Sequence, residues 1–163
     1  MLLAPFAAHA GNLSLVFTPA NQTVAPSGTV TFSGIITNTS TATVFVNNDS
    51  FNVDPLLSYD DTAFLSAGQF SLAPGASYPL SGSANLFDIT LDSKATLGST
   101  YTGTFTILGG ADNAAQDTQS ITNFSVTAAA VPETTTTLSF GLLLVSGGLL
   151  AVKMRKRSAV VQN

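Results

Sequence analysis

Residues 101–107, Tyr-Thr-Gly-Thr-Phe-Thr-Ile, decide the fold class of this chain. The large apolar side chains of Tyr101, Phe105 and Ile107 fall on odd positions, and threonine fills every even position. Successive side chains of a β-strand point to opposite faces, so this alternation is typical of a strand with one buried and one hydrated face. The same pattern predicts strands at 13–17, 30–36 and 120–127.

Two other segments predict strands with a less regular pattern. Residues 44–53 predict a strand that carries Phe45, Phe51 and Val53 on one side. Within residues 78–91 the alternation changes phase between Leu86 and Phe87, which indicates a β-bulge or two separate strands.

Explicit turn signals separate these runs. Ala25-Pro26-Ser27-Gly28 and Ala73-Pro74-Gly75 each combine a proline, which fixes φ, with a glycine, which tolerates positive φ. Little of residues 11–127 has a helical period, and the turn spacing suits about seven to nine short strands. We therefore predict an all-β, antiparallel Greek-key sandwich. With the Asn-Thr pair at Asn38, the pattern resembles immunoglobulin-like modules of bacterial surfaces, a resemblance that implies a fold and no activity.

The ionisable side chains of residues 11–130 are few: eight Asp, one Lys and three Tyr, without Glu, Arg, His or Cys. One lysine against eight aspartates gives a formal charge of −7, so we expect no DNA or RNA partner. No Ser-His or Cys-His pair can form there, and a glycosidase-like pair of carboxylates would lack the usual aromatic surroundings. We therefore expect that the chain is not an enzyme, with no catalytic residue and no cofactor.

Four carboxylates lie close together in the sequence, at Asp49, Asp54, Asp60 and Asp61. Calcium prefers clustered carboxylate and carbonyl oxygens, so these four residues are the candidates for a calcium site. They lack the spacing of an EF-hand, and solvated loop carboxylates are the competing interpretation. Lys94, the one lysine of residues 11–130, is expected in an exposed turn.

The C-terminal part joins an apolar run to a basic cluster. Residues 138–152 carry no charge and would span roughly 22 Å as a helix, and the threonines at 134–137 extend it to about 28 Å. This order predicts one transmembrane helix with a cytoplasmic C-terminus, a buried core helix being the alternative. The basic residues are Lys153, Arg155, Lys156 and Arg157.

A short motif, Val131, Pro132 and Glu133, precedes the apolar run. Motif, apolar run and basic cluster together resemble the PEP-CTERM sorting signal, with Thr134 at the position of that family's second proline. The resemblance implies recognition by an exosortase-like membrane transpeptidase, which cuts near the motif and passes the protein to the cell surface or matrix. An anchor that is never cut is the other interpretation.

Residues 1–10 end in Ala8-His9-Ala10, a small-x-small site of the kind that signal peptidase cuts. The stretch is short and has no basic start, so we interpret it as the remnant of a longer signal peptide. A hydrophobic N-terminus on a domain that is not exported is the alternative.

These features predict five segments and a location. The segments are a signal remnant at 1–10, a sandwich at 11–127, a linker with the sorting motif at 128–137, a transmembrane helix at 138–152 and a basic cytoplasmic tail at 153–163. We expect an exported protein anchored in the inner membrane with its β-domain outside, or released to the surface or matrix. Its expected role is structural or adhesive, with extracellular polysaccharide as a candidate partner. A tethered glycan- or calcium-binding module is the alternative.

Overall fold

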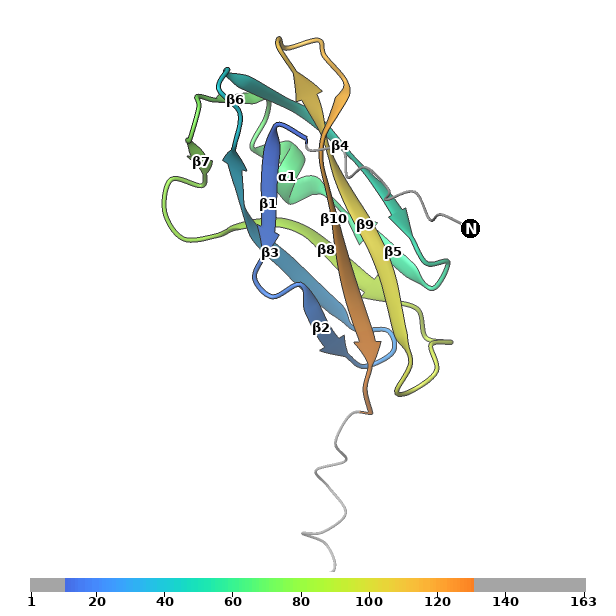
Figure 1. Cartoon of the computed structure of the whole chain (residues 1–163). Helices are drawn as coiled ribbons and strands as arrows, with labels where there is room; N and C mark the ends of the chain where they lie inside the picture. Colours follow the sequence, from blue (N-terminus) through green and yellow to red (C-terminus); the bar gives the residue numbers. More distant parts are fainter. Residues whose placement is uncertain (1–10, 131–163) are drawn as a thin grey trace, which may run out of the picture. The chain divides into compact units, whose positions relative to one another are not determined.

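The computed structural model describes residues 11–130, which form two five-stranded sheets and one short helix (Figure 1). The helix α1 (Thr62–Ser66) lies between β5 and β6 in the chain. The strands are β1 (Leu13–Phe17), β2 (Asn21–Val24), β3 (Thr29–Asn38), β4 (Val44–Val53), β5 (Leu57–Asp60), β6 (Phe70–Leu72), β7 (Ser77–Tyr78), β8 (Ala84–Leu91), β9 (Thr100–Gly110) and β10 (Asp117–Ala128). The last strand ends one residue beyond the predicted domain boundary at residue 127.

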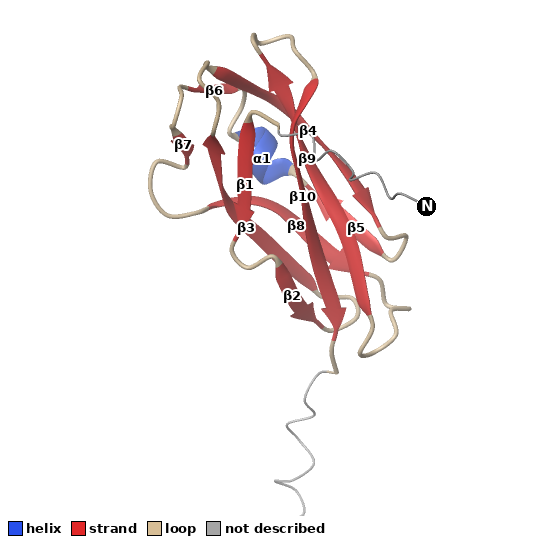
Figure 2. Ribbon diagram, in the orientation of Figure 1, coloured by secondary structure: helices blue, strands red, loops and turns tan. Residues whose placement is uncertain are grey.

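The two sheets are the layers of a β-sandwich, and almost every described element is a strand (Figure 2). The first sheet has the order β1-β3-β8-β5, with β7 also pairing with β3, and the second has the order β2-β10-β9-β4-β6. The longest ladder joins β9 to β10, from Thr100 opposite Thr127 to Gly109 opposite Asp117. The predicted all-β sandwich is therefore confirmed.

The alternation that predicted the strands separates core from surface. In β9, Phe105 and Ile107 are fully buried, while Thr102 between the inward positions is exposed. In β1, the inward residues from Leu13 to Phe17 alternate with exposed ones in the same way. Each sheet thus turns one apolar face toward the other, because a period of two places every second side chain on the same side.

Aromatic rings from both sheets meet between the layers, with Phe87 of β8 at the centre. Each of its ring centroid distances lies between 5.0 and 5.6 Å. Its partners are Phe17 and Phe32 from its own sheet, and Phe51, Phe105 and Phe124 from the opposite sheet. Such pairs contribute about 0.5–1.5 kcal/mol each beyond the burial of their area.

The sandwich is not wholly antiparallel, which corrects the predicted fold. β2 pairs parallel with β10, from Asn21 opposite Ser125 to Val24 opposite Ala128. Only residues 18–20 separate β1 from β2, so the chain keeps its direction as it passes from the first sheet to the second (Figure 1). β2 therefore pairs parallel with β10, because the chain does not reverse between β1 and β2.

A β-bulge in β4 makes one predicted side-chain placement wrong. The register between β4 and β9 shifts at Asn47, which is the extra residue. Val44 and Val46 face the core before the bulge, and Phe51 faces it afterwards. Phe45 is therefore on the opposite side of the strand from Phe51, although a regular strand would place the two together.

A second bulge explains the predicted change of phase at residues 86 and 87. The register between β3 and β8 shifts between Phe32 and Ser33, which leaves Leu86 without a partner in the ladder. Leu86 and Phe87 are consequently both buried, at 1% and 0% exposure. The prediction of a bulge in this segment is confirmed.

One of the two predicted turns places its positive φ on another residue. Gly75 has a φ of 75°, as expected. In the first turn, however, the positive φ of 66° belongs to Ser27. Gly28 is required for a different reason, because a Cβ there would lie 2.5 Å from Val24 Cγ2 and 2.9 Å from the Ala25 carbonyl oxygen.

The helix α1 was not expected from the sequence pattern. Its one buried residue, Phe64, packs edge-on against Phe105 at a centroid distance of 5.5 Å. Across residues 11–130, no helix has the length and apolar character needed to cross a membrane. The transmembrane helix predicted at 138–152 lies outside the described residues.

We expect Gly103→Ala to destabilise the domain by about 1–3 kcal/mol, as overpacking does in other cores. A Cβ at this position would lie 2.3 Å from Cζ of Phe124, whose ring is 2% exposed and held by its aromatic neighbours. Urea denaturation measures the effect. Thr102→Ala, on the exposed face one residue earlier, is the control and should change stability by at most about 0.5 kcal/mol. Equal midpoints for the two variants would contradict the packing argument.

Candidate functional site

Two of the four predicted calcium ligands are engaged in turns. Asp54 Oδ1 accepts a hydrogen bond from the Leu56 N–H at 2.9 Å. Asp60 Oδ1 accepts from the N–H of Thr62 at 2.9 Å and from its hydroxyl at 2.5 Å. These bonds from Thr62 lower the pKa of Asp60. Both carboxylates therefore stabilise the backbone next to β5.

The other two carboxylates, Asp49 and Asp61, repel each other. The bulge at Asn47 turns Asp49 inward, where it is only 9% exposed. Within residues 11–130 its Oδ2 is buried without a hydrogen-bond partner. Burial raises the pKa of Asp49 to about 7, with a further rise from the charge of Asp61 and an opposing effect from the Asp49 backbone N–H. Asp49 is thus a carboxyl group that the fold favours in its protonated form.

The predicted calcium ligands do not converge on one point. Over the described residues, no group of three or more His, Cys, Asp or Glu side chains is arranged to hold a metal ion. Calcium takes about six to eight oxygen ligands, so this arrangement gives the calcium hypothesis no support. The four candidates were Asp49, Asp54, Asp60 and Asp61.

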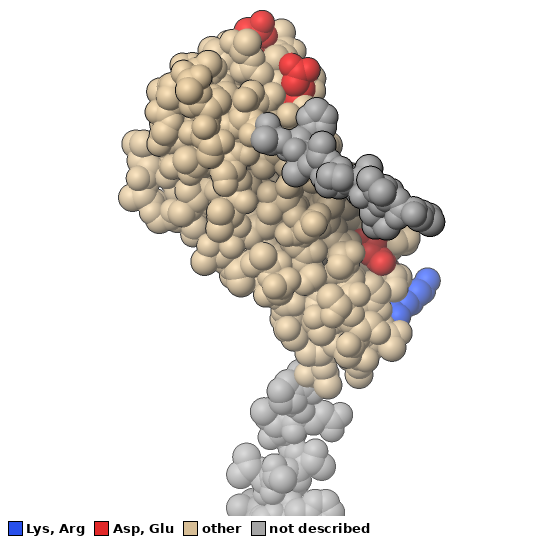
Figure 3. Space-filling view, viewed as in Figure 1, with Lys and Arg blue, Asp and Glu red and all other residues tan. Residues whose placement is uncertain are grey.

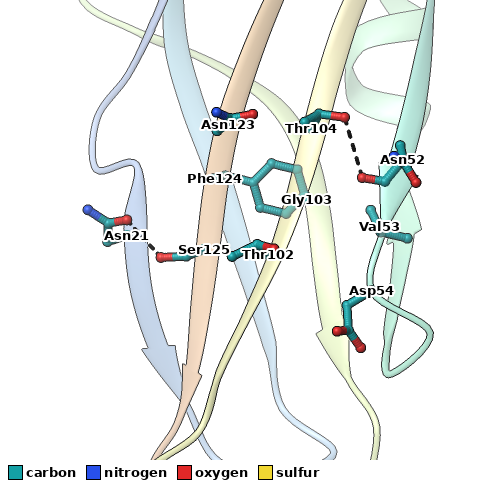
Figure 4. Close-up of a pocket in the computed structure, with 10 residues that line it drawn as sticks. All are labelled: Asn21, Asn52, Val53, Asp54, Thr102, Gly103, Thr104, Asn123, Phe124 and Ser125. Carbon is teal, nitrogen blue, oxygen red and sulfur yellow. Dashed lines mark hydrogen bonds between the residues drawn. The ribbon is translucent and has the colours of Figure 1, made fainter. Parts of the chain in front are cut away.

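A groove of about 610 Å³ lies on the outer face of the second sheet (Figure 4). It crosses β2, β10, β9 and β4, which are neighbours in that order. Polar side chains dominate its lining. The lining residues are Asn21, Asn52, Val53, Asp54, Thr102, Gly103, Thr104, Asn123, Phe124 and Ser125.

Strand pairing arranges the polar groups of the groove in two rows across the sheet. The first row consists of Asn21, Ser125, Thr102 and Asp54. Asn21 is opposite Ser125, Ser125 is opposite Thr102, and the Asp54 N–H donates to the Thr102 carbonyl oxygen at 3.1 Å. The second row consists of Asn123, Thr104 and Asn52, joined by the pairs 123–104 and 104–52.

The groove is rich in hydrogen-bonding groups and poor in charge. The Ser125 hydroxyl donates to Asn21 Oδ1 at 2.7 Å, and the Thr104 hydroxyl donates to the Asn52 carbonyl oxygen at 3.5 Å (Figure 4). Asp54 is the one charged residue of the lining. The volume of the groove falls within the range of small-ligand sites, about 300–1,000 Å³.

This groove was not predicted from the sequence, although a weak signal for it exists. Asn21, Asn52 and Asn123 all lie within strands, where asparagine is normally depleted. That departure could have drawn attention to these positions. Their assembly could not have been predicted, because the parallel pairing of β2 with β10 has no local signature.

The remaining predicted site residues divide between the turn at Lys94 and the two ends of the chain. Lys94 is exposed, as predicted, and its backbone N–H donates to Asp92 Oδ1 at 2.8 Å. The others lie outside the described residues. They are Ala8 and Ala10 of the signal-cleavage site, Val131, Pro132 and Glu133 of the motif, and Lys153, Arg155, Lys156 and Arg157 of the basic cluster.

We expect Asp49→Asn to stabilise the protein at pH 8 by up to about 4 kcal/mol and to have little effect at pH 4. Folded Asp49 keeps its proton up to a pH of about 7, whereas the unfolded chain releases it near 3.8. The folded state binds the extra proton in this window, so the stabilisation is complete below 3.8 and lost as pH rises toward 7. Urea denaturation between pH 4 and 8 measures the difference.

Asp117→Asn provides the control, since it removes an exposed carboxylate from the start of β10. Because the side chain is exposed, this substitution should change the stability by at most about 0.5 kcal/mol. If Asp49→Asn also follows the wild-type curve, the buried, protonated carboxyl group is refuted.

No protein-family profile matches the chain, and no curated protein matches it. Several solved structures resemble part of its fold. The secreted serine protease VesC from Vibrio cholerae is 17% identical with a TM-score of 0.44, over 75% of this chain and only 23% of that protein's length. AvmM, which catalyses macrocyclization in alchivemycin A biosynthesis, is 12% identical with a TM-score of 0.41, over 77% of this chain and 93% of AvmM. The seventh ScaB type I cohesin of Pseudobacteroides cellulosolvens is 14% identical with a TM-score of 0.31, over 74% of this chain and 95% of the cohesin chain.

Two of these matches contradict the prediction that the chain is not an enzyme, because their names describe a protease and a macrocyclization catalyst. That prediction does not stand: a lack of His, Cys and Glu in residues 11–130 leaves other chemistry open. With identities of 17% or less and TM-scores below 0.5, the same matches assign no reaction, ligand or partner to this chain.

Proposed function

We propose that this protein is an exported module of the cell surface or extracellular matrix, with a structural or adhesive role. The observation that carries the proposal is the position of the strands relative to the two processing signals. Every described strand, from Leu13 to Ala128, lies between Ala8-His9-Ala10 and Val131-Pro132-Glu133. Cleavage at both signals would therefore leave the sandwich intact.

The strand order supports an immunoglobulin-like, Greek-key version of the sandwich. Immunoglobulin domains place strands A, B, E and D in one sheet and C, F and G in the other. If β1, β3, β4, β5, β8, β9 and β10 are taken as A to G, the first sheet has the order A-B-E-D and the second contains G-F-C. β2, β6 and β7 are additions to this plan.

The C-terminal part supplies the anchor in this proposal. Residues 138–152 cross the inner membrane, the basic cluster at 153–157 stays in the cytoplasm, and the sandwich is outside. An exosortase-like enzyme is the proposed processing partner, acting near Val131-Pro132-Glu133. The order of motif, apolar run and basic cluster supports this assignment.

The outer face of the first sheet supports a structural role. Side-chain hydrogen bonds join β3 to β8 without any cysteine in the chain. Each such cross-strand pair contributes about 0.2–1 kcal/mol to the stability of the sheet. The pairs are Thr29 with Thr90 at 2.7 Å, Thr31 with Asp88 at 2.6 Å and Ser33 with Asn85 at 2.8 Å.

We expect the mature protein, recovered from the cell surface or medium, to begin at Gly11 and end near Glu133. Intact-mass spectrometry after cell fractionation measures both termini. Glu133→Gln should remain uncut in the membrane fraction, because it changes the proposed recognition motif. Thr136→Ser, in the neighbouring polar segment, is the control and should be processed normally.

Two results would count against the proposal in different ways. Full-length protein in the cytosol contradicts export. Protein at the surface that still ends at Asn163 contradicts processing and leaves only the anchor.

A further inference from the structure

The groove on the second sheet presents a grid of polar side chains to solvent. Neighbouring strands lie about 4.8 Å apart, and side chains on one face repeat about every 6.8 Å along a strand. The first row, from Asn21 to Asp54, therefore extends about 14 Å across the sheet. A surface of this form suits an elongated ligand lying across the strands.

The amides of the grid remain available to a ligand. Within residues 11–130 the side chains of Asn52 and Asn123 make no hydrogen bond, and Asn21 uses only its Oδ1. Each asparagine offers two donors and one acceptor. A hydroxyl group both donates and accepts, so adjacent amides and hydroxyls match a ligand with many hydroxyl groups.

The charge of the domain disfavours a polyanionic ligand. The lining contains no Lys or Arg to pair with a carboxylate, sulfate or phosphate. The formal charge of −7 on residues 11–130 repels polyanions. Few charged side chains appear among the described residues of the face shown in Figure 3.

An extended peptide fits this site less well. Peptides that add to a sheet need a free edge with unpaired backbone groups. The groove lies instead over β10 and β9, and each of these strands is paired on both sides. We infer that the two rows of polar side chains across the second sheet bind a neutral polysaccharide, an inference that rests on the adhesive role proposed above.

Native electrophoresis of the full-length protein through gels that contain a soluble polysaccharide tests the inference. We expect retardation by at least one neutral polymer among dextran, xylan, galactomannan and mixed-linkage β-glucan, and none by alginate. Asn52→Ala and Asn123→Ala should each weaken binding about tenfold, because each removes hydrogen bonds to the ligand. The double variant should migrate as it does without polymer.

Asn48→Ala is the matched control. Asn48 lies on β4, on the same exposed face as Asn52, but outside the groove. Removing the same amide there should leave retardation unchanged, and thermal midpoints verify that all variants fold. The inference is overturned if no neutral polymer retards the wild type, if alginate retards it equally, or if the double variant binds like the wild type. Export is decided separately by the mature termini.

Discussion

The contact between the two sheets rests on one continuous cluster of aromatic rings, with Phe87 in the middle. Backbone hydrogen bonds hold strands within each sheet, whereas the burial of apolar side chains is the main force that holds one sheet against the other. A few side-chain hydrogen bonds also cross between the sheets, such as that from Gln22 of β2 to the Thr31 carbonyl oxygen of β3 at 2.7 Å. The chain has no cysteine to add a covalent link. Five phenylalanine rings surround Phe87 from both layers. Two local features allow the rings to pack. The bulge in β8 buries Leu86 and Phe87 together, and Gly103 leaves room for the ring of Phe124.

Features of the fold that depend on residues adjacent in the chain could be predicted from the sequence. The alternation of residues 101–107 locates β9 because the period of two is a local property. The bulge at Leu86 was also predictable, since two successive large apolar side chains interrupt the pattern. The bulge at Asn47 was not, because its sequence neighbours fit a regular strand equally well. Phe45 was misplaced for that reason.

Features that depend on which strands pair with one another could not be predicted from the sequence. The carboxylates at 49–61 are close in sequence, yet Asp49 turns into the interior while Asp54 and Asp60 bond to nearby backbone. Proximity along the chain therefore suggested a metal site that the fold does not assemble in the described residues. The groove shows the opposite case. Asn21 and Ser125 are far apart in sequence and become neighbours only through the β2–β10 ladder.

The parallel pairing of β2 with β10 also determines how the domain would carry mechanical load. β10 is hydrogen-bonded on both sides near its C-terminal end, where the Ala129 N–H reaches the Val24 carbonyl oxygen and the Ala128 N–H reaches that of Ser99, each at 2.9 Å. Sheet hydrogen bonds lie across the strand direction. Tension along β10 at Ala128 would therefore stress two ladders in shear, all bonds together, instead of opening them one at a time. A sandwich with a bare β10 edge would have only one ladder to resist the same pull.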